Sequence, residues 1–216
     1  MESVPRHQCL VYEGSPSRHM PTLAVAIAQM LQRGCRCLYL NSPELAAEMR
    51  SYLAGEGVDT AEEIRRGALV LTSERHHLKD GRFDIDAMMR GLEEAFDQAL
   101  DDGYSGLWAT GDMTWEFGPA RDFSQLVDYE WQLEEFFQTH PEMGGVCQYH
   151  ADTLPRETMR QGLLTHPSIF INETLSLLNP HYLLPNSSPS PAEKISTARP
   201  AADSALDRLL RLEFKI

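Results

Sequence analysis

The sequence predicts an α/β protein with three layers, in which helices cover both faces of a mainly parallel sheet. Short apolar runs of strand length alternate with helical periodicities five or six times along the chain. This alternation is typical of parallel sheets, whose strands are joined by helices. No sequence repeat, heptad run or transmembrane pattern offers another interpretation. The 216 residues suit one domain of this class with a short tail.

The first strand–loop–helix unit, residues 7–34, is the stretch around which the rest of the fold is expected to form. Residues 9–12 are an apolar run, and residues 13–20 form a loop rich in turn-forming residues. Pro21 suits the first turn of a helix, where its missing N–H group is not needed. Apolar side chains then recur on one helical face, at Leu23, Ile27, Met30 and Leu31.

The loop after this first strand has the place of a phosphate-binding loop but not its residues. In the pattern G-x-x-x-x-G-K-[ST], glycine lets the backbone approach the phosphates, lysine contacts them and the hydroxyl binds Mg²⁺. Starting from Gly14, the second glycine position holds His19, the lysine position Met20 and the hydroxyl position Pro21. The sequence therefore predicts a nucleotide-binding scaffold that has lost its nucleotide chemistry, and we expect no enzymatic activity.

Composition disfavours several classes of function. A net charge of −13 argues against a direct nucleic-acid-binding surface and against adhesion to anionic membranes. The chain has neither an apolar run of membrane-spanning length nor an N-terminal segment of signal-peptide type. We therefore expect a cytoplasmic protein that binds neither nucleic acid nor membrane. The four cysteines, Cys9, Cys35, Cys37 and Cys147, should then be reduced thiols.

The remaining elements continue the alternation. Apolar runs predict further strands at residues 35–40, 68–72, 105–110, 145–150 and 168–172. Helical periodicities with start and stop signals predict helices at residues 43–53, 60–66, 84–102, 122–140 and 154–164. The loop at residues 73–81 contains His76 and His77, which we expect to be solvated.

A carboxylate follows the strand predicted at residues 105–110. Open α/β sheets bind ligands at the carboxyl edge of their strands, and Asp112 would lie at that edge, near the loop that starts at Gly14. Trp115 would add an apolar wall there. Asp112 is therefore a candidate site residue, although a simple turn at residues 111–112 explains it equally well.

Two further segments bring polar groups toward the same edge. The strand predicted at residues 145–150 ends in Tyr149 and His150. On the helix predicted at residues 122–140, Glu130 lies beside an apolar stripe, where a carboxylate needs a partner or access to water. Glu130 is therefore either a site residue or the margin of the polar face.

The chain changes composition after the last predicted strand. Residues 183–203 are rich in Pro, Ser and Ala, which predicts a flexible linker. Residues 204–216 carry Leu206, Leu209, Leu210 and Phe214 at the spacing of an amphipathic helix. Such a helix either packs on a partner or on a second copy of the chain, giving a homodimer, or folds back onto the domain.

Several short motifs follow one another in a specific order. They are His7, Cys9 and Tyr12 in the first strand, the loop around His19, residues 111–115, Tyr129 with Glu130, residues 147–150, and His166 with Pro167. In these motifs, residues 5–182 resemble the MEDS domain, the methanogen/methylotroph sensory domain of DcmR-type regulators. The resemblance implies a RecA-like fold, because the family is a degenerate relative of the RecA/KaiC-like P-loop ATPases.

The resemblance also implies a function. The family senses small molecules, hydrocarbon derivatives among them, and passes the signal to a transcriptional or kinase output. We therefore expect a non-catalytic sensory domain that binds a small organic ligand and signals to an output protein or domain. No output domain is recognisable after the sensor, so we expect either a stand-alone sensor acting through a partner or a fragment of a longer regulator.

Strand periodicity places the candidate ligand-binding residues. His7 and Cys9 share one face of their strand, as Cys147 and Tyr149 do of theirs, because side chains alternate. If the two strands are neighbours, these groups converge in a mostly uncharged pocket that suits a small organic ligand. The full candidate set is His7, Cys9, Tyr12, Glu13, Arg18, His19, Asp112, Trp115, Glu130, Cys147, Tyr149 and His150. This interpretation requires no cofactor and no metal.

Three alternatives stay open. One is a residual nucleotide-binding ATPase, with Asp112 and Glu130 as the metal and water residues. Another is a metal- or haem-binding redox sensor whose ligands are His7, Cys9, Cys147 and His150, since thiols and imidazoles are good ligands for soft metals. The last is an interaction module without any ligand.

Overall fold

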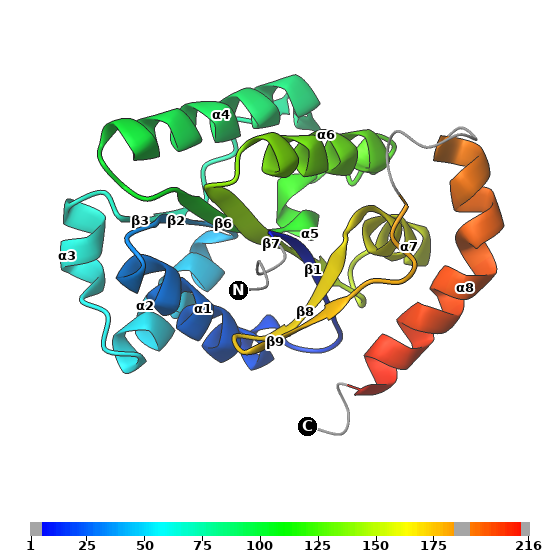
Figure 1. Cartoon of the computed structure of the whole chain (residues 1–216), viewed down its shortest axis with the longest axis horizontal. Helices are drawn as coiled ribbons and strands as arrows, with labels where there is room; N and C mark the ends of the chain where they lie inside the picture. Colours follow the sequence, from blue (N-terminus) through cyan, green and yellow to red (C-terminus); the bar gives the residue numbers. More distant parts are fainter. Residues whose placement is uncertain (1–5, 184–190, 213–216) are drawn as a thin grey trace.

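The computed structural model describes residues 6–183 and 191–212. Within these residues, the centre of the molecule is a seven-stranded sheet with the order β3-β2-β6-β7-β1-β8-β9 (Figure 1). Each neighbouring pair in this sheet is parallel except β8 and β9, which are antiparallel. The sheet is therefore mainly parallel, as predicted.

The strands form where the sequence has its apolar runs, because parallel strands are buried on both faces. They are β1 (His7–Tyr12), β2 (Arg36–Leu40), β3 (Leu69–Thr72), β6 (Leu107–Asp112), β7 (Met143–His150), β8 (Ser168–Asn172) and β9 (Leu175–Leu178). A separate small hairpin consists of β4 (Leu78–Lys79) and β5 (Arg82–Phe83).

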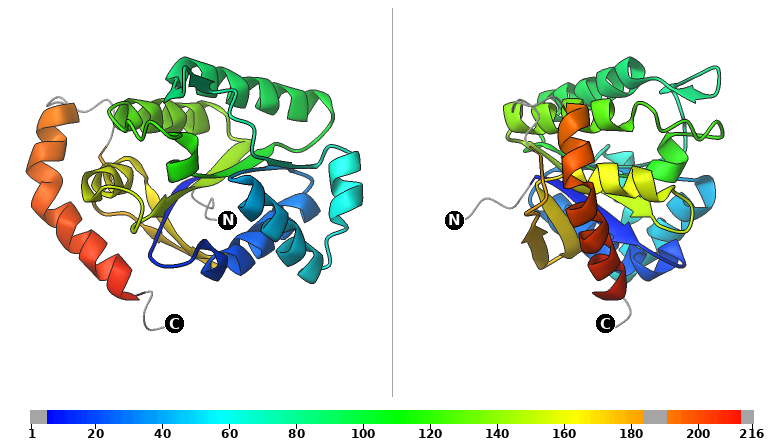
Figure 2. Two further views of the ribbon diagram at one scale, coloured as in Figure 1. Left: turned by 180° about the vertical axis from the view of Figure 1, so that it is seen from behind. Right: turned by 90° about the vertical axis from the view of Figure 1, so that its right-hand side faces the viewer.

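Helices cover both faces of the sheet (Figures 1 and 2). They are η1 (Pro16–Arg18), α1 (Met20–Gln32), α2 (Pro43–Gly55), α3 (Thr60–Arg65), α4 (Ile85–Asp101), α5 (Met113–Glu116), α6 (Leu126–Thr139), α7 (Arg156–Thr165) and α8 (Pro191–Leu212). One core lies between the sheet and α1 and α2, and the other between the sheet and α4 to α8. This arrangement confirms the three-layer α/β fold. None of the described helices is long and apolar enough to cross a membrane.

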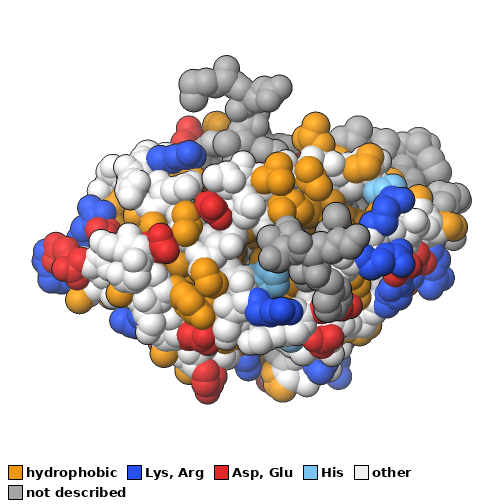
Figure 3. Space-filling view, turned by 90° about the horizontal axis from the view of Figure 1, so that it is seen from below, with side chains coloured by type: hydrophobic (Ala, Val, Ile, Leu, Met, Phe, Trp, Pro, Cys, Tyr) orange, Lys and Arg blue, Asp and Glu red, His pale blue; other side chains and the backbone are white. Residues whose placement is uncertain are grey.

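Two segments differ from the sequence prediction. The strand β9 was not predicted, and it exposes Leu175, Leu177 and Leu178. In the loop predicted at residues 73–81, His77 is buried rather than solvated, because its Nε2 donates a hydrogen bond of 2.8 Å to the carbonyl oxygen of Glu116. Elsewhere on the surface, the face seen from below carries hydrophobic side chains between basic and acidic ones (Figure 3).

The largest difference lies near the C-terminal end. Residues 191–203, predicted to be part of a flexible linker, belong to the helix α8. Alanine is the best helix former, and Pro191 occupies the first turn, where proline is tolerated. The linker prediction for residues 191–203 is therefore wrong, whereas residues 184–190 and 213–216 lie outside the described part of the chain.

Helix α8 folds back along α7 (Figure 2). Ala202 and Leu206 are fully buried, and Arg160 on α7 donates from Nη2 to Asp203 Oδ1 at 2.8 Å. Folding back was one of the two arrangements expected for this helix. Self-association of the chain through α8 stays a prediction.

Candidate functional site

Strand β1 carries side chains to both faces of the sheet. His7, Cys9 and Val11 point toward α6 and α7, and Leu10 and Tyr12 point toward α1. On one side β1 pairs with β7, so that Cys9 is opposite Cys147 and Val11 is opposite Tyr149. The sequence left open whether these two strands are neighbours, which is what the convergence of their side chains requires. The structure shows that they are.

Between the sheet and helices α6 and α7 lies a group of buried polar side chains that we call the polar cluster. It consists of His7, Glu130, Glu134, Cys147, Tyr149 and His166. His7 Nδ1 lies 2.8 Å from Glu134 Oε2, and His7 Nε2 lies 3.3 Å from Glu130 Oε2. Tyr149 donates its hydroxyl hydrogen to Glu130 Oε1. Glu130 is fully buried, so it does not form the margin of a polar helix face.

The members of the polar cluster adjust one another's ionisation. Burial favours a neutral imidazole, but Glu130 and Glu134 outweigh burial and raise the pKa of His7. Burial also opposes the ionised Glu130, yet His166, His7 and Tyr149 lower the pKa of this carboxyl. Burial, followed by repulsion from His7, lowers the pKa of His166 to about 4. The shifts therefore favour the charged form of His7, Glu130 and Glu134 and the neutral form of His166.

The thiol of Cys147 in this cluster and the thiol of Cys9 beside it stay protonated. Burial, followed by the charge of Glu130, raises the pKa of Cys147 well above its ordinary value and raises that of Cys9 as well. Since the thiolate is the nucleophilic form, neither cysteine has the electrostatic setting of a catalytic nucleophile.

A second set of polar residues lies at the carboxyl edge of the sheet, on the face toward α1. We call Tyr12, His19, Asp112 and His150 the edge group. The Tyr12 ring stacks on His150 with the centroids 4.8 Å apart, and the His19 ring lies 4.8 Å from Tyr12 on centroids. Burial, followed by the charges of Arg18 and His150, lowers the pKa of His19, which is therefore neutral near pH 7.

Asp112 is held by the protein on both of its oxygens. Its Oδ1 accepts the backbone N–H of Trp115 at 2.9 Å, which caps the short helix α5, and its Oδ2 accepts the Tyr12 hydroxyl at 3.3 Å. Burial raises the pKa of this carboxyl. The geometry thus gives Asp112 a structural role as a cap.

The loop between β1 and α1 has an internal partner for its first amide. Gly14 has a φ of 79°, and its N–H donates to Asp152 Oδ2 at 2.7 Å. In a phosphate-binding loop, the amides at such positions face the anion. Here a carboxylate of the protein occupies that position.

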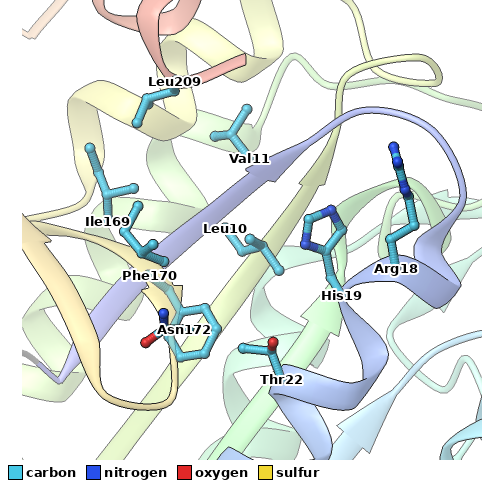
Figure 4. Close-up of a pocket in the computed structure, with 10 residues that line it drawn as sticks. Leu10, Val11, Arg18, His19, Thr22, Ile169, Phe170, Asn172 and Leu209 are labelled. Carbon is cyan, nitrogen blue, oxygen red and sulfur yellow. The ribbon is translucent and has the colours of Figure 1, made fainter. Parts of the chain in front are cut away.

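A cavity of about 520 Å³ lies between β1 and β8 (Figure 4). Between these two strands, the pairing consists of Gln8 with Ser168 and Cys9 with Ile169. Leu10, Val11 and Phe170, which follow these pairs along the two strands, line the cavity. The cavity is lined by Leu10, Val11, Arg18, His19, Thr22, Ile169, Phe170, Ile171, Asn172 and Leu209. Five elements, η1, α1, β1, β8 and α8, therefore contribute to one mostly apolar wall with a few polar groups.

The model of one protein family matches residues 6–167, and this family is MEDS, the methanogen/methylotroph, DcmR sensory domain. The chain belongs to the MEDS family. A comparison with curated protein sequences found no match. Among solved structures, the chain is similar to the flagellar accessory protein FlaH from Methanocaldococcus jannaschii, with 11% identity and a TM-score of 0.42 over 77% of this chain and 71% of that chain.

The family gives the chain a sensory role. The matched residues contain the polar cluster and the edge group, and they end just before β8. The second wall of the cavity and the helix α8 therefore lie outside the matched part. The relation to the RecA/KaiC-like ATPases and the degeneration of the phosphate loop stay predictions.

The MEDS domain separates the predicted site residues into two sets on opposite faces of the sheet. His7, Cys9, Glu130, Cys147 and Tyr149 lie in or beside the polar cluster. Tyr12, His19, Asp112 and His150 form the edge group. The two sets do not join in one pocket, because neighbouring positions of one strand, such as Tyr149 and His150, point to opposite faces.

Three predicted residues lie apart from both sets. Arg18 is exposed and lines the cavity, while Glu13 is half-buried in the loop after β1. Trp115 packs against His77 with the ring centroids 5.5 Å apart, and the Arg75 guanidinium lies 5.2 Å from the Trp115 ring.

The alternative metal set predicted from the sequence does not assemble. His7 and Cys147 come together, with 3.7 Å between His7 Nε2 and Cys147 Sγ. His150 stacks on Tyr12 on the opposite face, and Cys9 Sγ contacts the carbonyl oxygen of Ser168. A site built from all four of these residues is therefore excluded by the geometry.

Sequence reasoning missed three buried polar residues of this MEDS domain as site residues. Glu134 lies one helical turn after Glu130, so the i, i+4 spacing was a usable signal. His166 was part of a motif, but its position after α7 gave no indication of its direction. Glu116 is buried on α5, where burial, followed by the charges of Glu130 and Asp112, raises its pKa well above the ordinary value.

Proposed function

We propose that this MEDS domain senses a small, largely apolar organic molecule, which binds in the cavity between β1 and β8 and leaves it chemically unchanged. The observation that carries the proposal is the cavity itself. Its volume of about 520 Å³ falls in the range of roughly 300–1,000 Å³ that is typical of small-molecule sites. Its walls are mainly aliphatic and aromatic, so removing an apolar molecule from water favours binding.

The polar residues of the cavity support a ligand with one polar group. Arg18, His19, Thr22 and Asn172 supply hydrogen-bonding groups next to the apolar walls. A neutral His19 either donates or accepts a hydrogen bond, and the exposed Arg18 guanidinium suits a carboxylate. The ligand class is therefore a short hydrocarbon chain that bears one alcohol, amide or carboxylic acid group.

Nucleotide chemistry is disfavoured by contacts at the carboxyl edge of the sheet. The amide of Gly14 is bonded to Asp152, and Asp112 caps α5 with the carboxylate that a hydrolase would use for its metal. The loop has His19 and Met20 at the glycine and lysine positions of the phosphate-binding pattern. These features support a non-catalytic domain.

The signal would leave the domain through α8. Leu209 on this helix forms part of the cavity wall, so an occupied cavity changes the surface on which α8 rests. Polar contacts with α7 hold the helix, among them Arg156 Nη2 to Asp207 Oδ1 at 2.7 Å. An output protein or domain that binds α8 would therefore distinguish the ligand-bound from the ligand-free domain.

The test is calorimetric titration of the full chain with a series of short-chain alcohols, amides and carboxylic acids. We expect binding to strengthen with chain length until the cavity is filled. Thr22→Phe, which places a ring in the cavity, should weaken binding by tenfold or more while the melting temperature stays unchanged. Thr139→Phe, at an exposed position near the end of α6, is the matched control. Equal affinity of both variants for the series would show that the cavity is not the ligand site.

A second experiment tests whether ligand binding in the cavity affects helix α8. Hydrogen exchange of the backbone amides of α8 should slow when the best ligand of the series is bound, because Leu209 gains a contact. Ligand binding without any change of exchange in α8 would contradict this part of the proposal.

A further inference from the structure

Four side chains of the polar cluster bring one metal-ligating atom each to a common point. His7 comes from β1, Glu130 from α6, Cys147 from β7 and His166 from the end of α7. All four side chains are buried, and their ligand atoms all lie within 4.8 Å of one another. Residues far apart in the sequence, from the sheet and from the helices on one of its faces, thus meet at one place.

Four of the six distances between these atoms are close to those of a metal coordination shell, and all six are within 4.8 Å. Glu130 Oε2 lies 3.3 Å from His7 Nε2 and 3.4 Å from His166 Nε2. Cys147 Sγ lies 3.7 Å from His7 Nε2 and 3.9 Å from Glu130 Oε2. Around a tetrahedral Zn²⁺ ion, with bonds of about 2.0–2.3 Å, ligand atoms are about 3.3–3.6 Å apart.

Outer hydrogen bonds orient both imidazoles for coordination. His7 Nδ1 donates to Glu134 Oε2 at 2.8 Å, and His166 Nδ1 donates to the carbonyl oxygen of Gly162 at 2.7 Å. Both bonds leave Nε2 as the ligand atom, which is the arrangement that metal-binding histidines adopt. Tyr149 donates to Glu130 Oε1 and leaves Oε2 facing the two imidazoles.

One atom of this group lacks a hydrogen bond. His166 Nε2 is buried, and within the described residues no donor or acceptor satisfies it. Since His166 Nδ1 carries the proton, Nε2 presents a lone pair to Glu130 Oε2, which also presents lone pairs. A cation between the two atoms turns this unfavourable contact into two bonds.

We propose that His7, Glu130, Cys147 and His166 bind one divalent transition-metal ion, with Zn²⁺ as the best-fitting ion. A thiolate and a carboxylate balance the charge of the ion, so that the buried site is neutral. On binding, the Cys147 thiol proton and the proton on His7 Nε2 leave to solvent, and the metal–sulfur and metal–nitrogen bonds replace them. Four protein ligands complete the coordination shell, so the site is structural and connects β1, β7, α6 and α7.

The test uses the full chain, stripped with a chelator and then titrated with Co²⁺ or Zn²⁺. We expect one ion per chain by elemental analysis and a higher melting temperature with Zn²⁺. The Co²⁺ form should show the visible bands of a tetrahedral site and a near-ultraviolet band from sulfur to cobalt. Absence of bound metal, with no effect of Zn²⁺ on melting, would overturn the proposal and leave a purely hydrogen-bonded cluster.

Two cysteine variants make the test specific. Cys147→Ser should lose the sulfur-to-cobalt band, whereas Cys9→Ser should keep it, although Cys9 is also buried and lies opposite Cys147 in the sheet. Circular dichroism of both variants establishes that they fold. If Cys147→Ser does not fold, His166→Gln is the second variant, which should reduce Co²⁺ affinity at least tenfold. Retention of the band in folded Cys147→Ser, or unchanged affinity in His166→Gln, would refute the assignment.

Discussion

Two regions that share β1, the polar cluster and the cavity, hold their polar side chains in different ways. In the polar cluster, the side chains of His7 and Glu130 are fully buried and contact one another. On the cavity side, Arg18 is exposed and His19 is half-buried beside open space. In the first arrangement the polar side chains contact one another away from water, whereas the second leaves the Arg18 side chain accessible to a molecule from solution. Burial therefore distinguishes the polar cluster from the cavity that we propose as the ligand site.

The largest effect should follow from Glu130→Ala. This change leaves His7 and Tyr149 without their common acceptor, and breaking such a buried charged network costs roughly 3–5 kcal/mol. Urea unfolding followed by circular dichroism, with a chelator present, measures the loss. Glu135→Ala, at an exposed position of the same helix, should change stability by less than about 0.5 kcal/mol. Similar losses for both variants would mean that the cluster does not stabilise the fold.

A smaller effect should follow from Gly162→Ala on α7. A Cβ atom at this position would lie 2.3 Å from Cζ of Tyr149, so the helix must move away from the cluster. We expect a loss of about 1–3 kcal/mol, as for other overpacked cores. Gly91→Ala on α4 meets no atom within 4 Å and should instead stabilise by up to about 1 kcal/mol, because alanine favours helix. Thermal unfolding of the two variants should therefore shift in opposite directions.

The smallest effect concerns the pH dependence on the cavity side. The pKa of His19 is lowered in the folded state, so between that pKa and 6.5 the unfolded chain binds more protons than the folded one. The stability contributed by neutral His19 is complete above pH 6.5 and is lost as the pH falls below it. His19→Gln should reduce this slope in urea unfolding between pH 7.5 and 5. An unchanged slope in the variant would assign the pH dependence to other groups.

Much of the fold follows from periodicity in the sequence. Alternating apolar runs and helical stripes predicted the layers and the parallel strands, because those patterns report burial directly. The helix at residues 191–203 was missed because proline and serine were given more weight than the surrounding alanines. The strand β9 was missed because a short edge strand with exposed leucines has no alternation to detect.

The candidate site was harder to predict because strand order is a tertiary property. Strand alternation brought His7 and Cys147 together once β1 and β7 were assumed to be neighbours. The same alternation already separates Tyr149 from His150, so the two-sided arrangement could have been deduced. The direction of His166, in contrast, depends on how the end of α7 meets the sheet, and no local pattern encodes that.

One strand belongs to both regions, and this has a thermodynamic consequence. His7 on β1 reaches the polar cluster, while Leu10 and Val11 of the same strand line the cavity. Any occupant that shifts β1 therefore changes affinity at the other location, and linkage requires that the influence be equal in both directions. An ion bound by the polar cluster would then change the concentration at which an occupant fills half of the cavities.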